Sequence, residues 1–489
     1  MSTPREAIER FLKGSRLPVV LEAGDDPLPI QADSFALNDR GGMVTIECWS
    51  STRNLVRRVR AVQLEKRGRV ELEVERFGAR TGTLTLIDLA DPGNRDADRR
   101  GMRLKYRERF RRGLHRQFPG WRIVELSTEP DLHHSLSPSY PRAFLRKGTT
   151  ALAAIGAGDD SLSPEGVLSF GLIWLDYLRR RETRVGIEGL VVFVPVTAAV
   201  TTCHRIRCLN PERARYSVFV NGPGGQEDAV EPSEYTNFET RLDVCRRALG
   251  ESGARVANWV ERLQKIDGVE RRDRPDGSVS LAVRGFEFAR AAGDEVLFGI
   301  DGKHVAGSEA CVNEVEELAT GLARMRSAGA GDRGNPLYMR HPEAWLESQV
   351  RGGIEQLDAN LLPAPVYGQV PQFASGERSV IDLLAADREG RLAVIEVKAA
   401  QDIQLPLQAL DYWMRVKWHL DRGEFAGRGY FPGVALGNRT PRLLLVAPAL
   451  EFHPSNETVL GYFSREVEVE RFGIGVEWRK ELRVMFRMS

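Results

Sequence analysis

Cysteine is scarce in this chain. Five cysteines stand among 489 residues, and none of them forms the paired Cys-x-x-Cys spacing that is typical of a zinc site. Their odd number also argues against a framework of disulfides. We therefore expect reduced thiols and a cytoplasmic protein.

Long hydrophobic runs are absent as well. The longest apolar stretch, residues 189–200, contains Pro195 and is too short to span a bilayer. Residues 1–14 are polar and lack the apolar core of a signal peptide. The sequence thus predicts neither secretion nor membrane insertion, and no membrane partner.

Neither sign of charge dominates the composition. The 69 Lys and Arg residues nearly balance the 68 Asp and Glu residues, so only the local distribution of charge can indicate a partner. With 42% hydrophobic and 28% charged residues, the composition is that of a globular protein. Its length suits roughly two to four domains.

The clearest change of composition is the Gly-rich segment 326–336, which follows a helix-like pattern and predicts a domain boundary. We divide the chain into a mostly β region over 1–100, an α/β domain over 101–325 and a further α/β domain over 337–489. The oligomeric state is left open, with a homo-oligomer as one option.

Beyond residue 336, apolar periodicity and turn signals predict the element order αβββαβ. The expected helices cover 341–361 and 405–420, and the expected strands cover 364–373, 379–387, 391–399 and 441–449.

A short turn joins the second and third of these strands. Residues 387–391, Asp-Arg-Glu-Gly-Arg, fit a three-residue loop in which Gly390 adopts the left-handed conformation. In that register Asp382 lies directly opposite Glu396, with Cβ atoms about 4.5–5.5 Å apart. Lys398, two residues beyond Glu396, points to the same face.

Two facing carboxylates beside apolar residues repel each other and lose hydration. Mg²⁺, with Mn²⁺ as a substitute, would compensate, because it prefers oxygen ligands and is commonly held by one or two carboxylates with substrate phosphates. A neighbouring lysine can orient or deprotonate a water for attack. The alternative is that Glu396 and Lys398 form the solvated face of an edge strand. The two interpretations differ in whether this face is buried.

Asp382, the triplet Glu396-Val397-Lys398 and Gln408 on the following helix resemble the active-site signature of the PD-(D/E)XK nuclease superfamily. The resemblance covers about residues 337–450 and implies a restriction-endonuclease-like αβββαβ core. The proline in the superfamily's name is replaced here by Ile381.

By this resemblance, Asp382, Glu396 and the backbone carbonyl of Val397 would bind the metal, and Lys398 would position the attacking water. Gln408 would support the site or contact DNA, and a surface glutamine is the alternative.

The first helix of such a core often supplies a further acid. Glu347 is our candidate for this role, with Glu343 and Glu355 as rivals one or two turns away.

Residues 102–196 repeat the same order of predicted elements. Aligned by their letters, residues 152–158 match 392–398, with Gly156 at the position of Glu396 and Gly158 at that of Lys398. Such a degenerate copy of the core would be catalytically inactive. Chance similarity is the alternative.

The predicted helix 102–118 is rich in basic residues. Its apolar residues recur every four positions, which leaves the basic side chains elsewhere on its surface. Clustered arginines neutralise phosphates, although a solvated helix balanced by neighbouring acids is the alternative. The candidate nucleic-acid-binding residues are Arg103, Lys105, Arg107, Arg109, Arg111, Arg112 and Arg116.

The sequence therefore predicts a metal-dependent nuclease that hydrolyses phosphodiester bonds of nucleic acid, with DNA favoured, in repair, recombination or defence. One alternative is a catalytically inactive nucleic-acid-binding or regulatory protein that retains the nuclease fold. A hydrolase that uses the paired carboxylates on a sugar substrate ranks last. DNA against RNA, strand preference, and endonuclease against exonuclease activity stay open.

Overall fold

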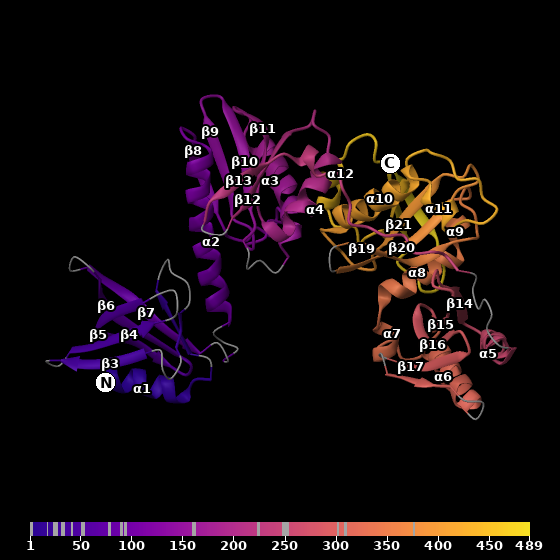
Figure 1. Ribbon diagram of the computed structural model, residues 1–489, viewed down its shortest axis with the longest axis horizontal. Coiled ribbons are helices and arrows are strands. Elements are labelled where there is room, and N and C mark those ends of the chain that lie inside the picture. The colour runs from indigo at the N-terminus through magenta and orange to yellow at the C-terminus, as the bar shows by residue number, and fades with distance from the viewer. Residues whose placement is uncertain are drawn as a thin grey trace. The chain divides into compact units, whose positions relative to one another are not determined.

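The computed structural model describes residues 3–16, 18–22, 28–30, 35–40, 43–49, 54–76, 80–88, 91, 95–158, 163–222, 225–246, 254–300, 303–307, 311–374 and 377–489. Within these residues the chain is a mixed α/β protein with four β-sheets (Figure 1). It divides into two compact units, one of residues 1–199 with 216–230 and one of residues 200–215 with 231–489.

The first unit begins with helix α1 (Pro4–Gly14) and an antiparallel sheet in the order β2-β1-β7-β6-β5-β4-β3. Thr3 caps α1 by accepting a hydrogen bond from the backbone N–H of Glu6, whose carboxylate accepts one from the N–H of Thr3. The helix buries Ala7 and Ile8 in the core of this sheet. The strands are β1 (Pro18–Glu22), β2 (Leu28–Pro29), β3 (Phe35–Arg40), β4 (Met43–Trp49), β5 (Asn54–Lys66), β6 (Arg69–Arg76) and β7 (Arg80–Asp88).

The second sheet of this unit has the strand order β13-β12-β11-β10-β9-β8. The helices of this part of the unit are α2 (Arg95–Gln117), the 3-10 helix η2 (Pro164–Gly166) and α3 (Val167–Arg181), and α4 (Val196–Arg207) begins in this unit and continues into the second. The strands are β8 (Arg122–Ser127), β9 (Arg142–Lys147), β10 (Thr150–Gly156), β11 (Gly186–Pro195), β12 (Arg215–Asn221) and β13 (Glu227–Val230).

The second unit contains a five-stranded antiparallel sheet in the order β14-β15-β16-β17-β18, with its own hydrophobic core. Its strands are β14 (Val269–Asp273), β15 (Val279–Val283), β16 (Phe286–Ala292), β17 (Glu295–Ile300) and β18 (Lys303–Ala306). Helices α5 (Ala254–Gln264) and α6 (Val312–Met325) pack on this sheet, and the 3-10 helix η3 (Pro232–Glu234) precedes them in the chain.

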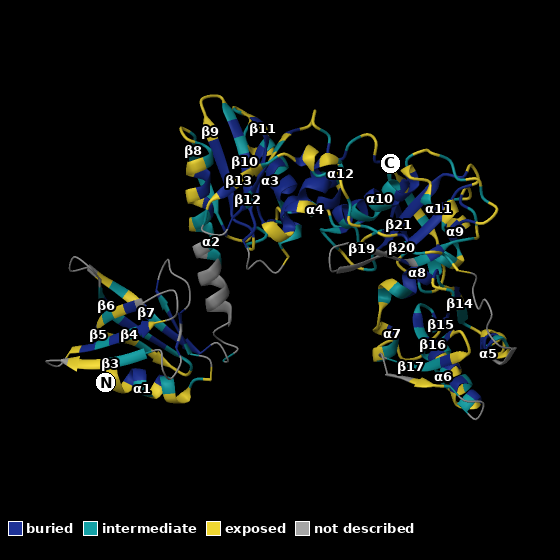
Figure 2. Cartoon of the chain, in the orientation of Figure 1, coloured by how far each residue is buried: buried dark blue, intermediate teal, exposed yellow. Residues whose placement is uncertain are grey.

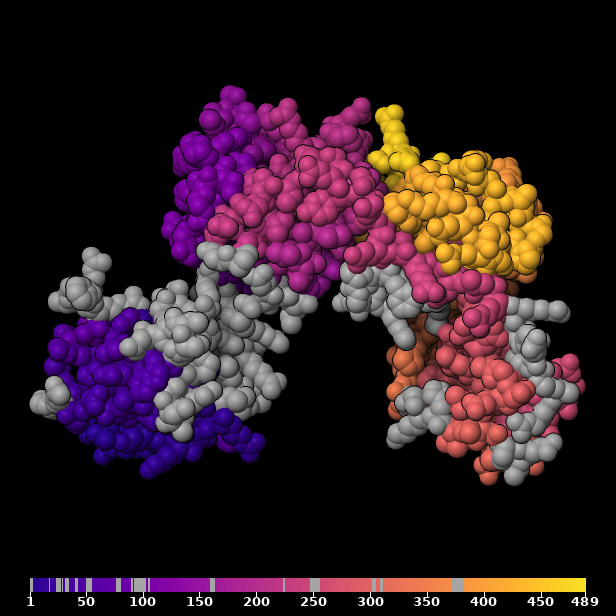
Figure 3. All heavy atoms as spheres, in the orientation of Figure 1, coloured from indigo at the N-terminus to yellow at the C-terminus, as the bar shows by residue number. Residues whose placement is uncertain are grey.

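The last sheet, also in the second unit, has the order β19-β20-β21-β22-β23-β24. Its strands are β19 (Tyr367–Ala374), β20 (Glu377–Ala386), β21 (Leu392–Val397), β22 (Arg442–Pro448), β23 (Val469–Ile474) and β24 (Val484–Met488). The helices are α7 (Pro336–Met339), α8 (Pro342–Gly352), α9 (Ile354–Leu357), α10 (Leu405–Asp421), α11 (Glu424–Gly427) and α12 (Ser455–Leu460). Figure 3 shows the atoms of both sheets of this unit, the five-stranded one in salmon and the six-stranded one in orange and yellow.

The element order α8, β19, β20, β21, α10, β22 is the αβββαβ order that the sequence predicts. The first helix is shorter than the predicted range 341–361. It ends at Gly352, and the backbone N–H of Gly353 bonds to the carbonyl of Gln349. The paired glycines end the helix because they lose more conformational entropy in a helix than other residues do.

The two six-stranded sheets have the same strand order and the same orientation in four strand pairs. In each, the first three strands pair antiparallel, the third pairs parallel with the fourth, and the last two pair antiparallel. A helix precedes the first strand and another connects the third to the fourth. The repeated element order expected from residues 102–196 is therefore present.

Equivalent hydrogen bonds align the two sheets. The backbone N–H of Ala157 donates to the carbonyl of Phe193 over 2.8 Å, just after β10. Just after β21, the N–H of Lys398 donates to the carbonyl of Val446 over 2.9 Å. Because both bonds continue the same parallel strand pair, Ala157 corresponds to Lys398.

This correspondence corrects the alignment made by letters. Counting back two residues, Ile155 rather than Gly156 corresponds to Glu396, and Gly158 does not correspond to Lys398. The partner of Ile155 on β9 is Arg142, which takes the position of Asp382. A shift of one residue along a strand moves every side chain to the other face of the sheet, so the two alignments assign different residues to the face that carries the acids in the last sheet.

The core of the last sheet lies between β20, β21, β22 and helix α8 (Figure 2). Ile395 and Val397 are fully buried in this core, beside Trp345 of α8. Because side chains alternate along a strand, Glu396 points to the opposite face, where α10 packs on β21 and β22. In the described part of the chain, no helix combines the length and the apolar character needed to cross a membrane.

Candidate metal centre

The hairpin of β20 and β21 has the turn that the sequence predicts. The backbone N–H of Asp387 donates to the carbonyl of Arg391 over 2.9 Å, and that of Gly390 donates to the carbonyl of Asp387 over 3.0 Å. Gly390 has φ +78°, the left-handed conformation. The loop is therefore the three residues 388–390, as predicted.

This turn sets the register of the hairpin. Leu383 pairs with Ile395, and one further step in the same register sets Asp382 opposite Glu396. Oδ2 of Asp382 accepts a hydrogen bond from the backbone N–H of Val397 over 2.9 Å. The structure thus brings together the two acids that the sequence predicts to face each other.

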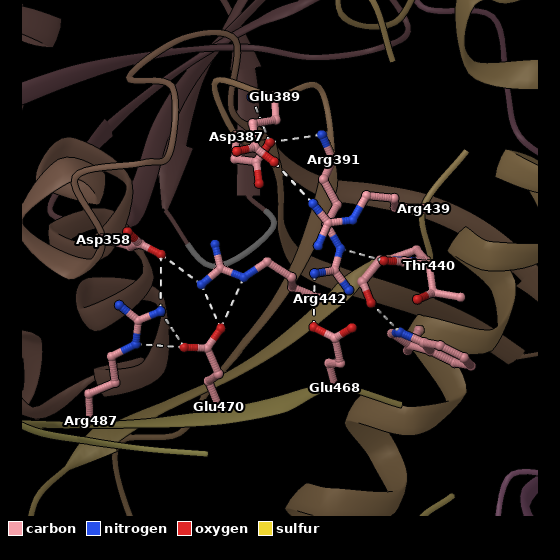
Figure 4. Close-up of polar contacts among 12 residues, drawn as sticks. Asp358, Asp387, Glu389, Arg391, Arg439, Thr440, Arg442, Glu468, Glu470 and Arg487 are labelled. Atoms are coloured by element: carbon pink, nitrogen blue, oxygen red, sulfur yellow. Dashed lines mark hydrogen bonds and ion pairs between the residues drawn. The ribbon is translucent and has the colours of Figure 1, made fainter. Parts of the chain in front are cut away.

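An ion-pair network fixes the closed end of the hairpin (Figure 4). Arg391 donates to the carbonyl of Thr440 over 2.7 Å and to Glu468 over 2.8 Å. Arg442 pairs with Asp358 and Glu470, each at 2.6 Å. Because these groups tie the hairpin to β22 and β23, the acids at its other end have a fixed position.

Both acids are largely removed from solvent. Glu396 is 3% exposed, and its Oε2 finds no hydrogen-bond partner among the described residues. Burial, and next the charge of Asp382, raise the pKa of Glu396 well above its ordinary value, although Lys398 opposes them. Burial raises the pKa of Asp382 to about 6, against the opposing hydrogen bond from Val397. The interpretation as a solvated edge strand does not fit this burial.

Lys398 lies among carboxylates. Its Nζ is 3.7 Å from Glu396 Oε1, 3.7 Å from Asp402 Oδ2 and 4.0 Å from Glu343 Oε1. Burial acts to lower its pKa, but the charges of Glu396, Glu343 and other nearby acids outweigh it, so the pKa is raised. A charged ammonium is suited to orienting a water rather than to removing its proton.

Glu347 is buried on α8 beside Asp382, and its charge is one of the causes that raise the pKa of Asp382. Both of its oxygens are engaged: Oε1 accepts from Arg351 over 2.5 Å and Oε2 from Arg272 over 3.1 Å. The structure thus brings Glu347 to the site, but paired with two arginines.

The two rivals of Glu347 differ in position. Glu343 in the first turn of α8 is half-exposed and near Lys398. Glu355 pairs with Arg388 in the hairpin turn over 2.9 Å, and so lies at the closed end, away from the acid pair.

A pocket of about 410 Å³ opens beside Asp382. Its small alanine side chains leave room for a ligand next to the acids. The lining residues are His341, Pro342, Glu343, Ala344, Glu347, Asp382, Ala399 and Ala400.

Helix α10 carries Gln408 in its first turn, half-buried. One turn later stands Tyr412, a residue that the sequence analysis missed. Burial raises the pKa of Tyr412, and the charges of Glu396 and Asp382 add to this, so its hydroxyl lies within their electrostatic reach. The spacing of four residues from Gln408, which puts both on one face of a helix, was the available signal.

The arginines of α2 differ in their surroundings. Arg116 pairs with the buried Glu227 at 2.6 Å, and Arg109 donates to the carbonyl of Gly222 over 3.0 Å. Arg111 pairs with Glu108 on the same helix at 2.6 Å. These arginines already have partners within the chain. Their role in binding nucleic acid stays a prediction.

The other basic residues of α2 differ in their exposure to solvent. Arg112 is exposed, and Arg103 and Arg107 are partly exposed. The side chain of Lys105 lies outside those that the structure describes.

The donor set fits a hard divalent cation. Mg²⁺ is commonly held by one or two protein carboxylates, with waters and substrate phosphates as its other ligands. Here two carboxylates face each other, and one of them has a buried oxygen that no described residue hydrogen-bonds. Within the described residues, no cluster of three or more His, Cys, Asp and Glu side chains is arranged to hold a metal ion. The candidate centre is therefore an acid pair, and the Val397 carbonyl stays a predicted third ligand.

Comparisons with known proteins add no assignment: no family model matches the chain, and no curated protein matches it.

Proposed function

We propose that this protein is a nuclease of the PD-(D/E)XK type, which hydrolyses phosphodiester bonds of nucleic acid, DNA in the first place, with Mg²⁺ as its cofactor. The observation that carries the proposal is the acid pair removed from solvent, in which an oxygen of Glu396, opposite Asp382, accepts no hydrogen bond from any described residue. Buried like charges are costly, and a divalent cation offsets that cost. The shared topology of the two six-stranded sheets supports a duplicated nuclease-like core.

The residues have separate roles in this proposal. When bound, the metal would polarise the scissile phosphate and lower the pKa of a bound water. Asp382 and Glu396 would hold it, and the ion-pair network at the closed end of the hairpin supports the strands that carry these carboxylates. Lys398, held among Glu396, Asp402 and Glu343, presents its ammonium to the water and to the charge that develops on the phosphate.

The second core of the proposal, in the first unit, is catalytically inactive. Arg142, Ile155 and Ala157 stand where the last sheet has Asp382, Glu396 and Lys398. An arginine and two apolar side chains offer no oxygen ligand to a metal. Its framework remains available for scaffolding or for binding nucleic acid.

The test is cleavage of labelled DNA and RNA, single-stranded, double-stranded and branched, with Mg²⁺, with Mn²⁺ and with a chelator. Wild type should give products only with metal. Lys398→Met should reduce cleavage by at least about 100-fold, the range for one lost catalytic group, with DNA affinity within about threefold. Lys417→Met, which removes an ammonium paired with Asp421 at 2.7 Å on α10, is the matched control and should cut as wild type does.

One result would remove a single role from the proposal, and another would overturn it. Cleavage by Lys398→Met at the rate of wild type would remove the role of this lysine. Tight DNA binding by wild type with no metal-dependent product would favour the inactive nucleic-acid-binding protein instead.

A further inference from the structure

Helix α8 is held by the five-stranded sheet as well as by its own. The turn between β15 and β16 approaches it so closely that a Cβ at Gly285 would lie 1.9 Å from the carbonyl oxygen of Ala344. The guanidinium of Arg284 lies 5.6 Å from the ring centre of Trp345. The position of α8, and of the acids on it, therefore depends on this sheet.

The same sheet sends a charged side chain to α8. Arg272 of β14 reaches Glu347 with Nη1 at 3.1 Å from Oε2, and the two side chains are only 7% and 5% exposed. Glu270, on the same strand, accepts a hydrogen bond from Ser348, the next residue of α8. Strand β14 thus contacts α8 at two successive residues.

Strand β19 leaves room for the second arginine at Glu347. A Cβ at Gly368 would lie 1.3 Å from Nη2 of Arg351, which donates to Oε1 of Glu347. The carboxylate is therefore clamped between two guanidiniums, one from its own helix and one from another sheet.

We propose that Arg272 is a positioning residue of the candidate metal centre: it holds Glu347 as a counter-ion and keeps that carboxylate from becoming a ligand of the cation bound by Asp382 and Glu396. The five-stranded sheet thereby contributes to the centre. This inference rests on the proposed function, because it presupposes a cation at the acid pair.

The charge of a carboxylate that accepts charge-assisted hydrogen bonds from two guanidiniums is already balanced, so a cation gains little from it unless one such bond is lost. In a buried site that bond is not replaced by water. Removal of the Arg272 guanidinium frees Oε2 of Glu347 beside Asp382 and leaves the site more negative by one charge.

The experiment measures Mn²⁺ affinity by titration of the full-length protein without nucleic acid, followed by electron paramagnetic resonance. Arg272→Met should bind Mn²⁺ at least about fivefold more tightly than wild type, because a positive charge near the cation is lost. Arg272→Lys, which keeps the charge, should stay within about twofold of wild type.

The double variant Arg272→Met with Glu347→Gln removes a buried ion pair with no net change of charge. It should return the Mn²⁺ affinity to within about twofold of wild type, because Glu347 is not a ligand in this proposal. It also serves if Arg272→Met does not fold, since it keeps the net charge of wild type and leaves Arg351 an amide oxygen as hydrogen-bond acceptor.

The results that would contradict the inference differ from the result that would contradict the proposed function. A loss of at least about tenfold in Mn²⁺ affinity in the double variant would make Glu347 a ligand and overturn the inference. Unchanged or weaker binding by a folded Arg272→Met would also overturn it. If wild type itself binds no Mn²⁺, the proposed function fails first, and the inference fails with it.

Discussion

At the scale of single residues, the carboxylates of Asp382 and Glu396 repel each other and lose hydration when both are charged, and this conflict destabilises the folded protein. Both carboxyl groups have a raised pKa, because burial disfavours their charged forms. Without a cation, the folded state therefore relieves the conflict by taking up protons. With a cation, the charged forms become favourable.

The first prediction follows from this proton uptake. The pKa of Asp382 is about 6 in the folded protein against 3.8 for the ordinary carboxyl group, so the folded state binds more protons than the unfolded state between about pH 4 and pH 6. The free energy of unfolding therefore falls as pH rises through that window. For the metal-free protein we expect Asp382 to contribute roughly 1 kcal/mol of extra stability at pH 5 relative to pH 7.

Urea denaturation of the chelator-treated protein at both pH values measures this difference. Asp382→Asn should reduce the gain at pH 5, whereas Asp421→Asn, which removes an exposed acid on α10, should leave it unchanged. Saturating Mn²⁺ should reverse the trend, because metal binding requires deprotonated carboxyl groups. An equal gain in wild type and Asp382→Asn would contradict the assignment.

The sequence could predict some of these residues and not others. The pairing of Asp382 with Glu396 follows from five consecutive turn residues, 387–391, which fix the register locally. The clamp on Glu347 depends on Arg272, 75 residues earlier in the chain, on a different sheet. Such a contact arises from packing, and no local spacing signals it.

At the scale of elements, the hairpin turn needs a glycine for two separate reasons. Gly390 has φ +78°, and a Cβ there would lie 2.0 Å from the carbonyl oxygen of Ala435. Gly433 has nearly the same φ of +80°, but a Cβ there would meet nothing within 4 Å. An alanine at 433 would therefore meet backbone strain alone, whereas an alanine at 390 would meet backbone strain and a steric clash.

We predict that Gly433→Ala lowers the free energy of unfolding by about 1 kcal/mol, the cost of a left-handed alanine. Gly390→Ala should lower it by more than about 2.5 kcal/mol, because the collision adds to the strain. It should also weaken Mn²⁺ binding, since the turn sets the register of the acid pair. Equal losses of stability in the two variants, measured by urea denaturation, would show that the close approach to Ala435 is unimportant.

Helix α2 offers a second prediction at this scale, because its arginines fall into two groups. Arg109 donates to Gly222 and Arg116 pairs with Glu227, whereas the other group, Arg103, Arg107 and Arg112, is partly or fully exposed. We expect the exposed group to contact phosphates and the engaged group to stabilise the fold. Phosphate contacts release counterions and so make affinity depend on salt.

Replacing Arg103, Arg107 and Arg112 together by Gln should weaken DNA binding and lower the slope of log affinity against log salt by up to about 3, one unit for each lost phosphate contact. The matched variant Arg116→Gln should lower thermal stability and leave this slope within about 1 of wild type. Fluorescence anisotropy at several salt concentrations gives the slopes. An unchanged slope in the triple variant would place the phosphate contacts elsewhere.

At the scale of the whole molecule, two sheets with one topology carry different residues at equivalent positions. The order of elements could be predicted for both sheets, because helices and strands differ in the period of their apolar residues along the sequence. The alignment of single residues could not, because letters alone matched Gly156 to Glu396 and missed the slip of one residue. Hydrogen bonds between parallel strands, which depend on the folded sheet, identify Ile155 and Arg142 as the equivalents.

The last prediction concerns where the whole chain binds metal. Because Arg142 and Ile155 take the positions of the two acids, the sheet of the first unit should bind none, and all tight Mn²⁺ binding should belong to the last sheet. The double variant Asp382→Asn with Glu396→Gln should therefore lose all binding that wild type shows below about 1 mM Mn²⁺, a range typical of carboxylate sites in proteins. Circular dichroism and urea denaturation of the metal-free variant show whether it folds, and it should be at least as stable as wild type at pH 7, because neutral amides replace two facing acids that are removed from solvent. Tight Mn²⁺ binding retained by the folded variant would mean that another part of the chain holds a metal.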